Sequence, residues 1–133
     1  KGVIPEFMKE VEWDHKGLSD LIVTKTMAER KHLLFKGVDA IVTLPGGMGT
    51  LEELSEILSM KKLGQFYKPI ILLNVDHFYD PLIEMIDRMI DQKFMNEYHR
   101  DLYKVTDDPE EVIALIKSTS DWTADAINHA VNN

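Results

Sequence analysis

The chain has 133 residues, with 15 basic and 23 acidic side chains and a formal net charge of −8, which argues against a nucleic-acid-binding surface. Its 44% hydrophobic content suits one globular domain, and no apolar run is long enough to cross a bilayer, so we expect no membrane partner. The absence of cysteine excludes disulfides and thiolate metal sites and is compatible with a reducing compartment; we therefore expect a cytoplasmic protein.

Short apolar segments alternate with helical patterns in the first part of the chain. Residues 1–5 are typical of a strand that ends in a turn, and residues 21–24 of a second strand. Thr26 and Glu29 have the form of a capping box that opens a helix ending at Gly37. Residues 40–44 are β-branched and uncharged, which predicts a strand buried on both faces.

The same alternation continues to the end of the chain. Apolar residues at helical spacing predict a helix over 51–64, and residues 69–75 give the clearest buried strand. Asp80 and Pro81 cap and start another helix, whose inner side includes Met85 and Met89. A last strand over 102–105 and a last regular helix starting at 108–111 follow. We therefore predict a single α/β domain over 1–117, doubly wound and Rossmann-like with a mostly parallel sheet, and an extra helix or tail over 118–133.

The glycine-rich turn between the strand at 40–44 and the following helix is the main candidate for chemistry. Glycines let the backbone approach a ligand closely, and the first amides of a helix have no intrahelical acceptor, so a phosphate fits there. The turn lacks the Gly-Lys-Ser/Thr of a P-loop and the spacing of a dinucleotide fingerprint. Taken alone, it is equally compatible with an ordinary tight βα turn. Its candidate phosphate ligands are Gly46, Gly47, Gly49 and Thr50.

Two charged residues stand out by position. Glu53 lies in the first turn of the helix after the glycines, and Arg30 lies near the start of the preceding helix. In a doubly wound sheet ligands bind beyond the carboxyl ends of the strands, so both side chains could face one cleft. Each also has a structural alternative, since Glu53 could complete a capping box with Thr50 and Arg30 could be a solvated helix residue.

These residues resemble the paired signatures of the LONELY GUY family of cytokinin riboside 5′-monophosphate phosphoribohydrolases, often labelled lysine decarboxylase-like. The first signature covers residues 26–31, the second is the Pro-Gly-Gly-x-Gly-Thr-x-x-Glu motif at 45–53, and the spacing between them is similar as well. Residues 63–64, 68–69 and 72–76 extend the resemblance to roughly residues 2–117. The resemblance implies that the chain is the C-terminal two thirds of the family domain, N-terminally incomplete, with two further strands and another glycine-rich turn upstream.

The implied activity is hydrolysis of the N-glycosidic bond of AMP or its N6-substituted relatives, giving free base and ribose 5-phosphate. Glu53 and Arg30 are the implied catalytic residues, because a carboxylate can stabilise positive charge on the ribose and orient water while a guanidinium holds phosphate or ribose oxygens. The glycines and Thr50 would hold the 5′-phosphate. Possible further substrate ligands are Met27, Lys31, Met48 and Asn74.

Other expectations follow from the same resemblance. The family often has histidine at the position of Ala28 and tyrosine at that of Met48, which affects base recognition. The histidines lack metal-ligand spacing and no residue supports a pyridoxal phosphate lysine, so we expect no metal and no cofactor. We expect a homodimer that shares the apolar faces of the helices over 27–36 and 51–64. The alternative function is a non-catalytic carrier of a nucleotide or of the molybdenum cofactor.

Overall fold

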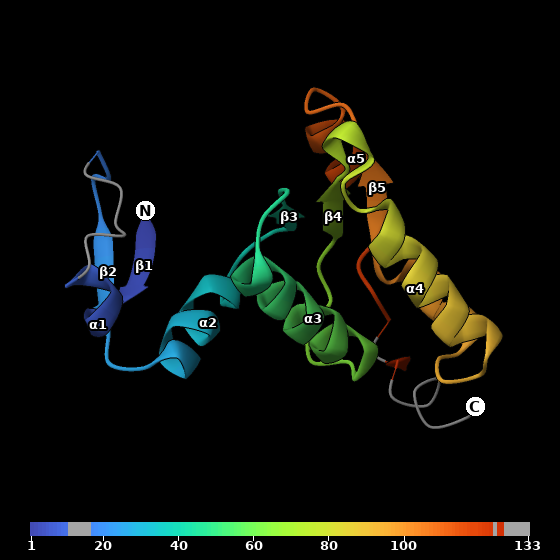
Figure 1. Ribbon diagram of the computed structural model, residues 1–133, viewed down its shortest axis with the longest axis horizontal. Coiled ribbons are helices and arrows are strands. Elements are labelled where there is room, and N and C mark those ends of the chain that lie inside the picture. Colours follow the sequence, from blue (N-terminus) through green and yellow to red (C-terminus); the bar gives the residue numbers. More distant parts are fainter. Residues whose placement is uncertain (11–16, 124, 127–133) are drawn as a thin grey trace. The chain divides into compact units, whose positions relative to one another are not determined.

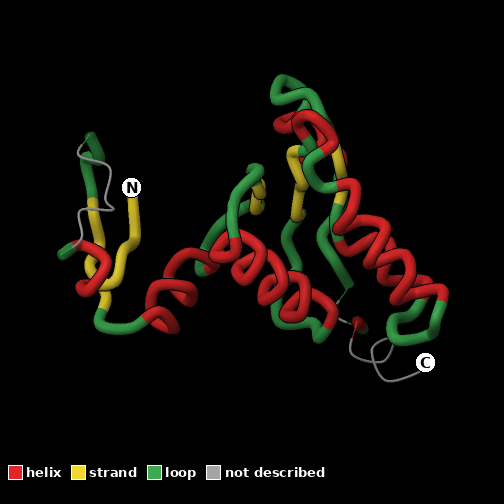
Figure 2. The backbone as a smooth tube through the Cα atoms, viewed as in Figure 1, coloured by secondary structure: helices red, strands yellow, loops and turns green. Residues whose placement is uncertain are grey.

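The computed structural model describes residues 1–10, 17–123 and 125–126 and forms two compact units, Lys1–Val38 and Asp39–Asn133. Each unit alternates strands with helices, as Figures 1 and 2 show. All described strand pairs are parallel, which confirms the predicted α/β fold. The described strands form a two-stranded sheet in the first unit and a three-stranded sheet in the second.

The first unit is a parallel strand pair with two helices. β1 (Gly2–Pro5) pairs with β2 (Leu21–Thr24), α1 (Glu6–Lys9) follows β1, and α2 (Met27–Phe35) follows β2. The Thr26 hydroxyl accepts a hydrogen bond from the Glu29 amide at 3.1 Å, so the predicted cap is present. The Glu29 carboxylate accepts from the Lys25 amide at 2.9 Å, one residue before the cap. Gly37, with φ of +70°, ends the helical segment as predicted.

The second unit is built on a central buried strand. β4 (Ile70–Leu73) lies between β3 (Ile41–Thr43) and β5 (Lys104–Thr106), and its residues are at most 7% exposed, as the sequence predicted. Leu54, Ile57, Ile86 and Ile90 are buried apolar side chains of the helices in this unit, each at most 7% exposed. The other elements of this unit are α3 (Met48–Lys62), η1 (Val75–His77), α4 (Asp80–Asp91), η2 (Glu97–Leu102) and α5 (Val112–Ser118).

Two burial predictions in this unit were wrong. Val42 is 39% exposed, because β3 is an edge strand of its three-stranded sheet and is not covered on both faces. Met85 and Met89 are 50% and 37% exposed, because the buried stripe of α4 runs through Ile86 and Ile90 and each methionine lies about 100° around the helix from it.

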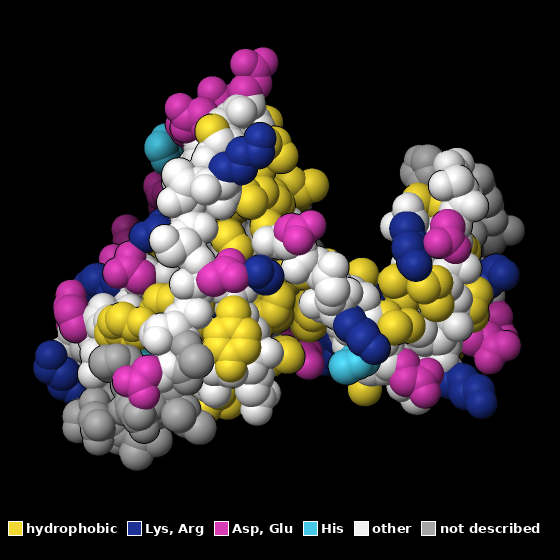
Figure 3. All heavy atoms as spheres, turned by 180° about the vertical axis from the view of Figure 1, so that it is seen from behind, with side chains coloured by type: hydrophobic (Ala, Val, Ile, Leu, Met, Phe, Trp, Pro, Cys, Tyr) yellow, Lys and Arg dark blue, Asp and Glu magenta, His cyan; other side chains and the backbone are white. Residues whose placement is uncertain are grey.

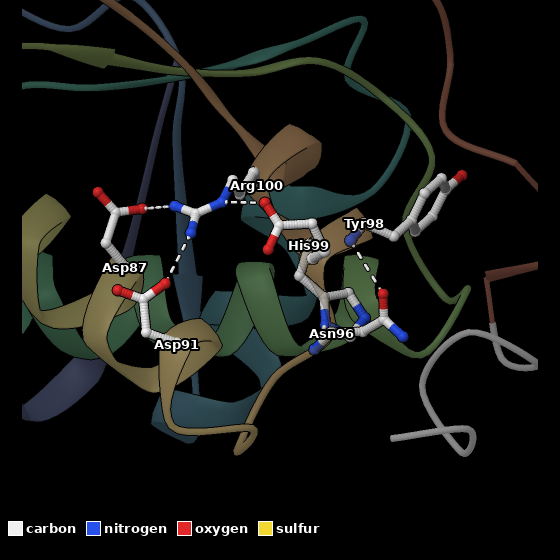
Figure 4. Close-up of polar contacts among 7 residues, drawn as sticks. Asp87, Asp91, Asn96, Tyr98, His99 and Arg100 are labelled. Carbon is white, nitrogen blue, oxygen red and sulfur yellow. Dashed lines mark hydrogen bonds and ion pairs between the residues drawn. The ribbon is translucent and has the colours of Figure 1, made fainter.

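A polar network fixes the 3₁₀ helix η2 against α4 (Figure 4). Arg100 donates to Glu97 Oε1 at 2.6 Å and to Asp91 Oδ1 at 3.0 Å, and it also pairs with Asp87. Asn96 caps η2 by accepting from the Tyr98 amide at 3.0 Å. Because η2 continues to Leu102, the last strand begins at Lys104, two residues later than predicted.

The segment after α5 returns to the body of the second unit. The Trp122 amide donates to the Tyr67 carbonyl at 2.6 Å, and the Trp122 ring lies 4.5 Å from that of Tyr98. Residues 119–123 are not helical, while half of the expected extra helix or tail lies outside the described residues. No helix in the described part of the chain has the length and apolar character needed to span a membrane.

Candidate phosphate-binding turn

The glycine-rich turn connects the end of β3 directly to a long helix. β3 ends at Thr43, and Gly47 is the N-cap of α3 with an extended backbone, φ −89° and ψ −159°. The first amides of α3 therefore belong to Met48, Gly49 and Thr50, and they have no acceptor within the helix. Together with the positive end of the helix dipole, they make this turn suited to an anion.

The three glycines differ in their surroundings. A Cβ on Gly46 would lie 2.2 Å from Thr50 Oγ1, so the threonine side chain lies directly against this glycine. A Cβ on Gly47 or Gly49 would meet no atom within 4 Å. The structure thus brings Gly46 and Thr50 together and leaves open space beside Gly47 and Gly49.

The predicted capping box of Thr50 and Glu53 was wrong. Thr50 is the third residue of α3 and not its N-cap, because the helix begins two residues earlier, after Gly47. The glycine backbone makes the turn compact enough for the helix to start there. Glu53 therefore does not have the N3 position from which such a residue reaches back to the cap.

Glu53 lies on the flank of α3, one helical turn beyond Gly49 and Thr50. Residues three and four apart share one side of a helix, so Glu53 is on the same side as these two residues. It is half-buried, whereas its neighbour Leu54 points into the core and is only 2% exposed. Helix geometry thus places a carboxylate beside the proposed anion-binding amides.

Arg30 belongs to the first unit and is not a solvated helix residue. Its side chain is half-buried, and its Nε donates to the Val3 carbonyl of β1 at 3.2 Å. Met27 and Lys31, from the same helix, are half-buried as well. Because Arg30 and Glu53 lie in different units, the cleft that we expect them to share stays a prediction.

Met48 and Asn74 differ in accessibility. Met48, at the start of α3, is 79% exposed. Asn74, directly after β4, is 7% exposed; its Oδ1 accepts from the Tyr79 amide at 2.6 Å and its Nδ2 donates to Asp80 Oδ1 at 2.7 Å. Asp80 was expected to cap α4, but it is the first residue of that helix and its carboxylate instead accepts from Asn74.

Sequence reasoning missed Tyr79. Its side chain is 4% exposed, and its hydroxyl donates to the Leu44 carbonyl at 2.6 Å, two residues before Gly46. Burial raises the pKa of this hydroxyl above its ordinary value, so it stays a donor at neutral pH. The only signal in the sequence is an aromatic residue just before Asp80 and Pro81, which by itself predicts no contact with a turn 35 residues earlier.

Comparison with known proteins places these features in a family. Residues 1–116 match the model of a family described as "Possible lysine decarboxylase". A curated relative from Arabidopsis thaliana, cytokinin riboside 5′-monophosphate phosphoribohydrolase LOG2, is 34% identical over 87% of this chain and 54% of its own length. The enzyme of that name from Rhodococcoides fascians is 40% identical over 88% of this chain and 60% of its own length.

A third relative, LOG from Oryza sativa subsp. japonica, carries the same enzyme name and is 41% identical over 72% of this chain and 40% of its own length. The chain therefore spans about half the length of the curated relatives that it matches. These similarities confirm the resemblance noted from the two signatures. Since the family model matches most of the chain, the protein belongs to the family described as possible lysine decarboxylases.

Proposed function

We propose that the protein hydrolyses the N-glycosidic bond of adenosine-type 5′-monophosphates and releases free base and ribose 5-phosphate. The observation that supports this most is the open glycine turn at the start of α3, with Thr50 against Gly46 and Glu53 one helical turn away. Relatives at 34–41% identity named as cytokinin riboside 5′-monophosphate phosphoribohydrolases support the substrate class. We do not propose decarboxylation from the family description, because nothing in the residues supports a lysine that holds pyridoxal phosphate.

In this proposal the 5′-phosphate binds the amides of Gly47 to Thr50 and the Thr50 hydroxyl. The net charge of −8 gives no general attraction for an anion, so the phosphate depends on this local set of donors. The exposed Met48 and the half-buried Met27 and Lys31 are proposed to line the rest of the substrate site.

Glu53 is proposed to act on the anomeric carbon. As the C1′–N9 bond breaks, its electron pair leaves with the base and positive charge develops on the ribose ring, which a carboxylate stabilises. The same carboxylate accepts a proton from the attacking water, whose oxygen bonds to C1′. The departing base takes up a proton from solvent, and Glu53 then releases its proton to solvent, so that the net reaction consumes one water. Arg30 is proposed to hold phosphate or ribose oxygens with its planar guanidinium.

Incubation of the purified protein with AMP and with N6-isopentenyladenosine 5′-monophosphate tests this activity. We expect chromatography to show free base and ribose 5-phosphate in equal amounts from at least one substrate. Thermal stabilisation by both nucleotides without any product would instead favour the carrier alternative. If the assay shows neither product nor stabilisation, the hydrolase and the nucleotide carrier are both contradicted.

We further propose that the protein forms a homodimer through apolar helix faces. Leu51 and Leu63 at the two ends of α3 are 37% and 46% exposed, and Leu33 in α2 is 38% exposed. Figure 3 shows apolar side chains, in yellow, at the surface of both units. Light scattering should give twice the monomer mass, and Leu51→Glu should shift the protein toward the monomer; a monomeric wild type would contradict this proposal.

A further inference from the structure

The loop between β4 and α4 has an unusual backbone. Asp76 and His77 have φ angles of +51° and +60°, the left-handed region that side chains other than glycine rarely adopt. Such conformations cost free energy and persist only where surrounding contacts hold them. The contacts that hold this loop therefore indicate what it is built to position.

Asn74 closes the loop from its first residue. The backbone amide of Asn74 donates to the Thr106 carbonyl of β5 at 2.7 Å, which anchors the loop to the sheet. Its side chain accepts from the Tyr79 amide and donates to Asp80, so both ends of the amide group are engaged. His77 Nδ1 also lies 3.1 Å from Asp80 Oδ2. The net effect is a fixed position for Tyr79.

Tyr79 connects this loop to the glycine-rich turn. Its ring is buried and packs edge-on against Phe78 with ring centroids 5.0 Å apart. Its hydroxyl donates to the carbonyl of Leu44, which lies just beyond the last residue of β3 and before Pro45. The side chain of Leu44 itself is 57% exposed, so packing of that side chain does little to hold the turn. The tyrosine hydroxyl is thus a direct restraint on the backbone that leads into Gly46 and Gly47.

We propose that Tyr79 is a positioning residue for phosphate binding, held in place by Asn74 and acting through the Leu44 carbonyl on the amides at the start of α3. This inference rests on the proposed function and adds to it a residue outside both sequence signatures. Asn74, which we expected to be a possible substrate ligand, then contributes through Tyr79 and not by touching the base. A hydrogen bond that fixes donors in the bound geometry lowers the cost of ordering them when the anion binds.

Tyr79→Phe removes the hydroxyl and keeps the buried ring. We expect the dissociation constant for ribose 5-phosphate, measured by calorimetry, and the KM for the nucleotide to rise about tenfold, the effect of losing one hydrogen bond. The kcat should change less than about twofold, because phosphate contacts bind substrate and transition state alike. Inhibition by the free base should not change. Tyr103→Phe, which alters a buried tyrosine on the other side of β4, is the matched control and should leave all four values unchanged.

Asn74→Asp separates positioning from direct contact. The substitution removes the donor to Asp80 and should weaken ribose 5-phosphate binding without changing inhibition by the free base. Weaker inhibition by the free base would show that Asn74 touches the base and would overturn its assignment as a residue that acts through Tyr79. Unchanged ribose 5-phosphate affinity in a folded Tyr79→Phe protein would overturn the role of Tyr79. Failure of the wild-type protein to bind ribose 5-phosphate at all would instead overturn the proposed function, so the two failures are distinguishable.

Discussion

Glu53 is the residue whose environment bears most directly on the chemistry. Its helix position excludes the capping role that the sequence allowed, and it is partly buried on the same side of α3 as Gly49 and Thr50. The sequence could not decide between these roles, because a Thr-x-x-Glu pattern has the same letters whether the helix begins at the threonine or two residues before it. The position of the N-cap rules out the capping role, and the catalytic role of Glu53 stays a proposal.

Glu53→Gln should retain nucleotide binding and lose turnover. The amide keeps the size and polarity of the side chain but cannot accept a proton from water or stabilise positive charge on the ribose, so kcat should fall about 10²–10⁴-fold. Steady-state kinetics and calorimetry measure the two effects separately. Glu52→Gln, one residue away and exposed, is the control and should keep wild-type kcat. An unchanged rate in Glu53→Gln would remove Glu53 from the mechanism.

At the scale of the element, substitutions of the glycines at the start of α3 distinguish a role in stability from the proposed role in phosphate binding. Gly49 lies within the helix and a Cβ there meets open space, so Gly49→Ala should raise the free energy of unfolding by about 0.5–1 kcal/mol through better helix propensity. The same methyl group would stand beside the proposed phosphate, so nucleotide affinity should fall. Chemical denaturation and calorimetry on one preparation measure both effects.

Gly46→Ala is the matched comparison. Its Cβ would lie 2.2 Å from Thr50 Oγ1 and 2.9 Å from Thr50 Cβ, so the start of the helix must shift and the free energy of unfolding should fall by about 1–3 kcal/mol. If Gly49→Ala destabilises the protein as much as Gly46→Ala, then the open space beside Gly49 is not available to a ligand.

The sequence predicted which helices and strands form in both units, but it predicted their exposure and their long-range contacts less well. Local patterns identified the buried strand β4, the Thr26 cap and the C-terminal ends of α2 and α3, because these depend on residues close in the chain. The exposure of Val42 and the role of Tyr79 depend on strand order and on a contact between residues 35 positions apart, which periodicity does not encode. The glycines that we propose to bind phosphate could be named from the sequence, but Tyr79, which we propose restrains them, could not.

At the scale of the whole molecule, one buried charge makes stability depend on pH. Lys61 of α3 is 2% exposed; its Nζ donates to the Lys68 carbonyl at 3.1 Å and lies 5.5 Å from the centre of the Trp122 ring. Burial lowers the pKa of Lys61 to about 8, the nearby charge of Lys104 lowers it as well, and Asp121 offsets part of this change. The folded state therefore loses this proton well below the ordinary value of 10.5.

Lys61→Met should remove this dependence. Below pH 8 Lys61 is protonated in both the folded and the unfolded wild type, and the folded protein bears the full cost of the buried charge. Between about pH 8 and 10.5 the unfolded state binds more protons than the folded state. The contribution of Lys61 to the free energy of unfolding therefore rises with pH in this window. At pH 7 the methionine variant should be more stable than wild type by about 1 kcal/mol, since an apolar side chain of similar length replaces the charge and one hydrogen bond is lost. As pH rises through this window the wild type gains up to about 3 kcal/mol, so the advantage of the variant should shrink and then reverse in sign. Other titrating groups, including the buried Tyr79 and Tyr103, are present in both proteins and cancel in the difference.

Urea denaturation at pH 7, 8, 9 and 10 measures the difference in the free energy of unfolding between the variant and the wild type. The exposed Lys117→Met variant is the control and should differ from wild type by a pH-independent amount. A constant difference for Lys61→Met would mean that Lys61 keeps an ordinary pKa and that water reaches its ammonium group.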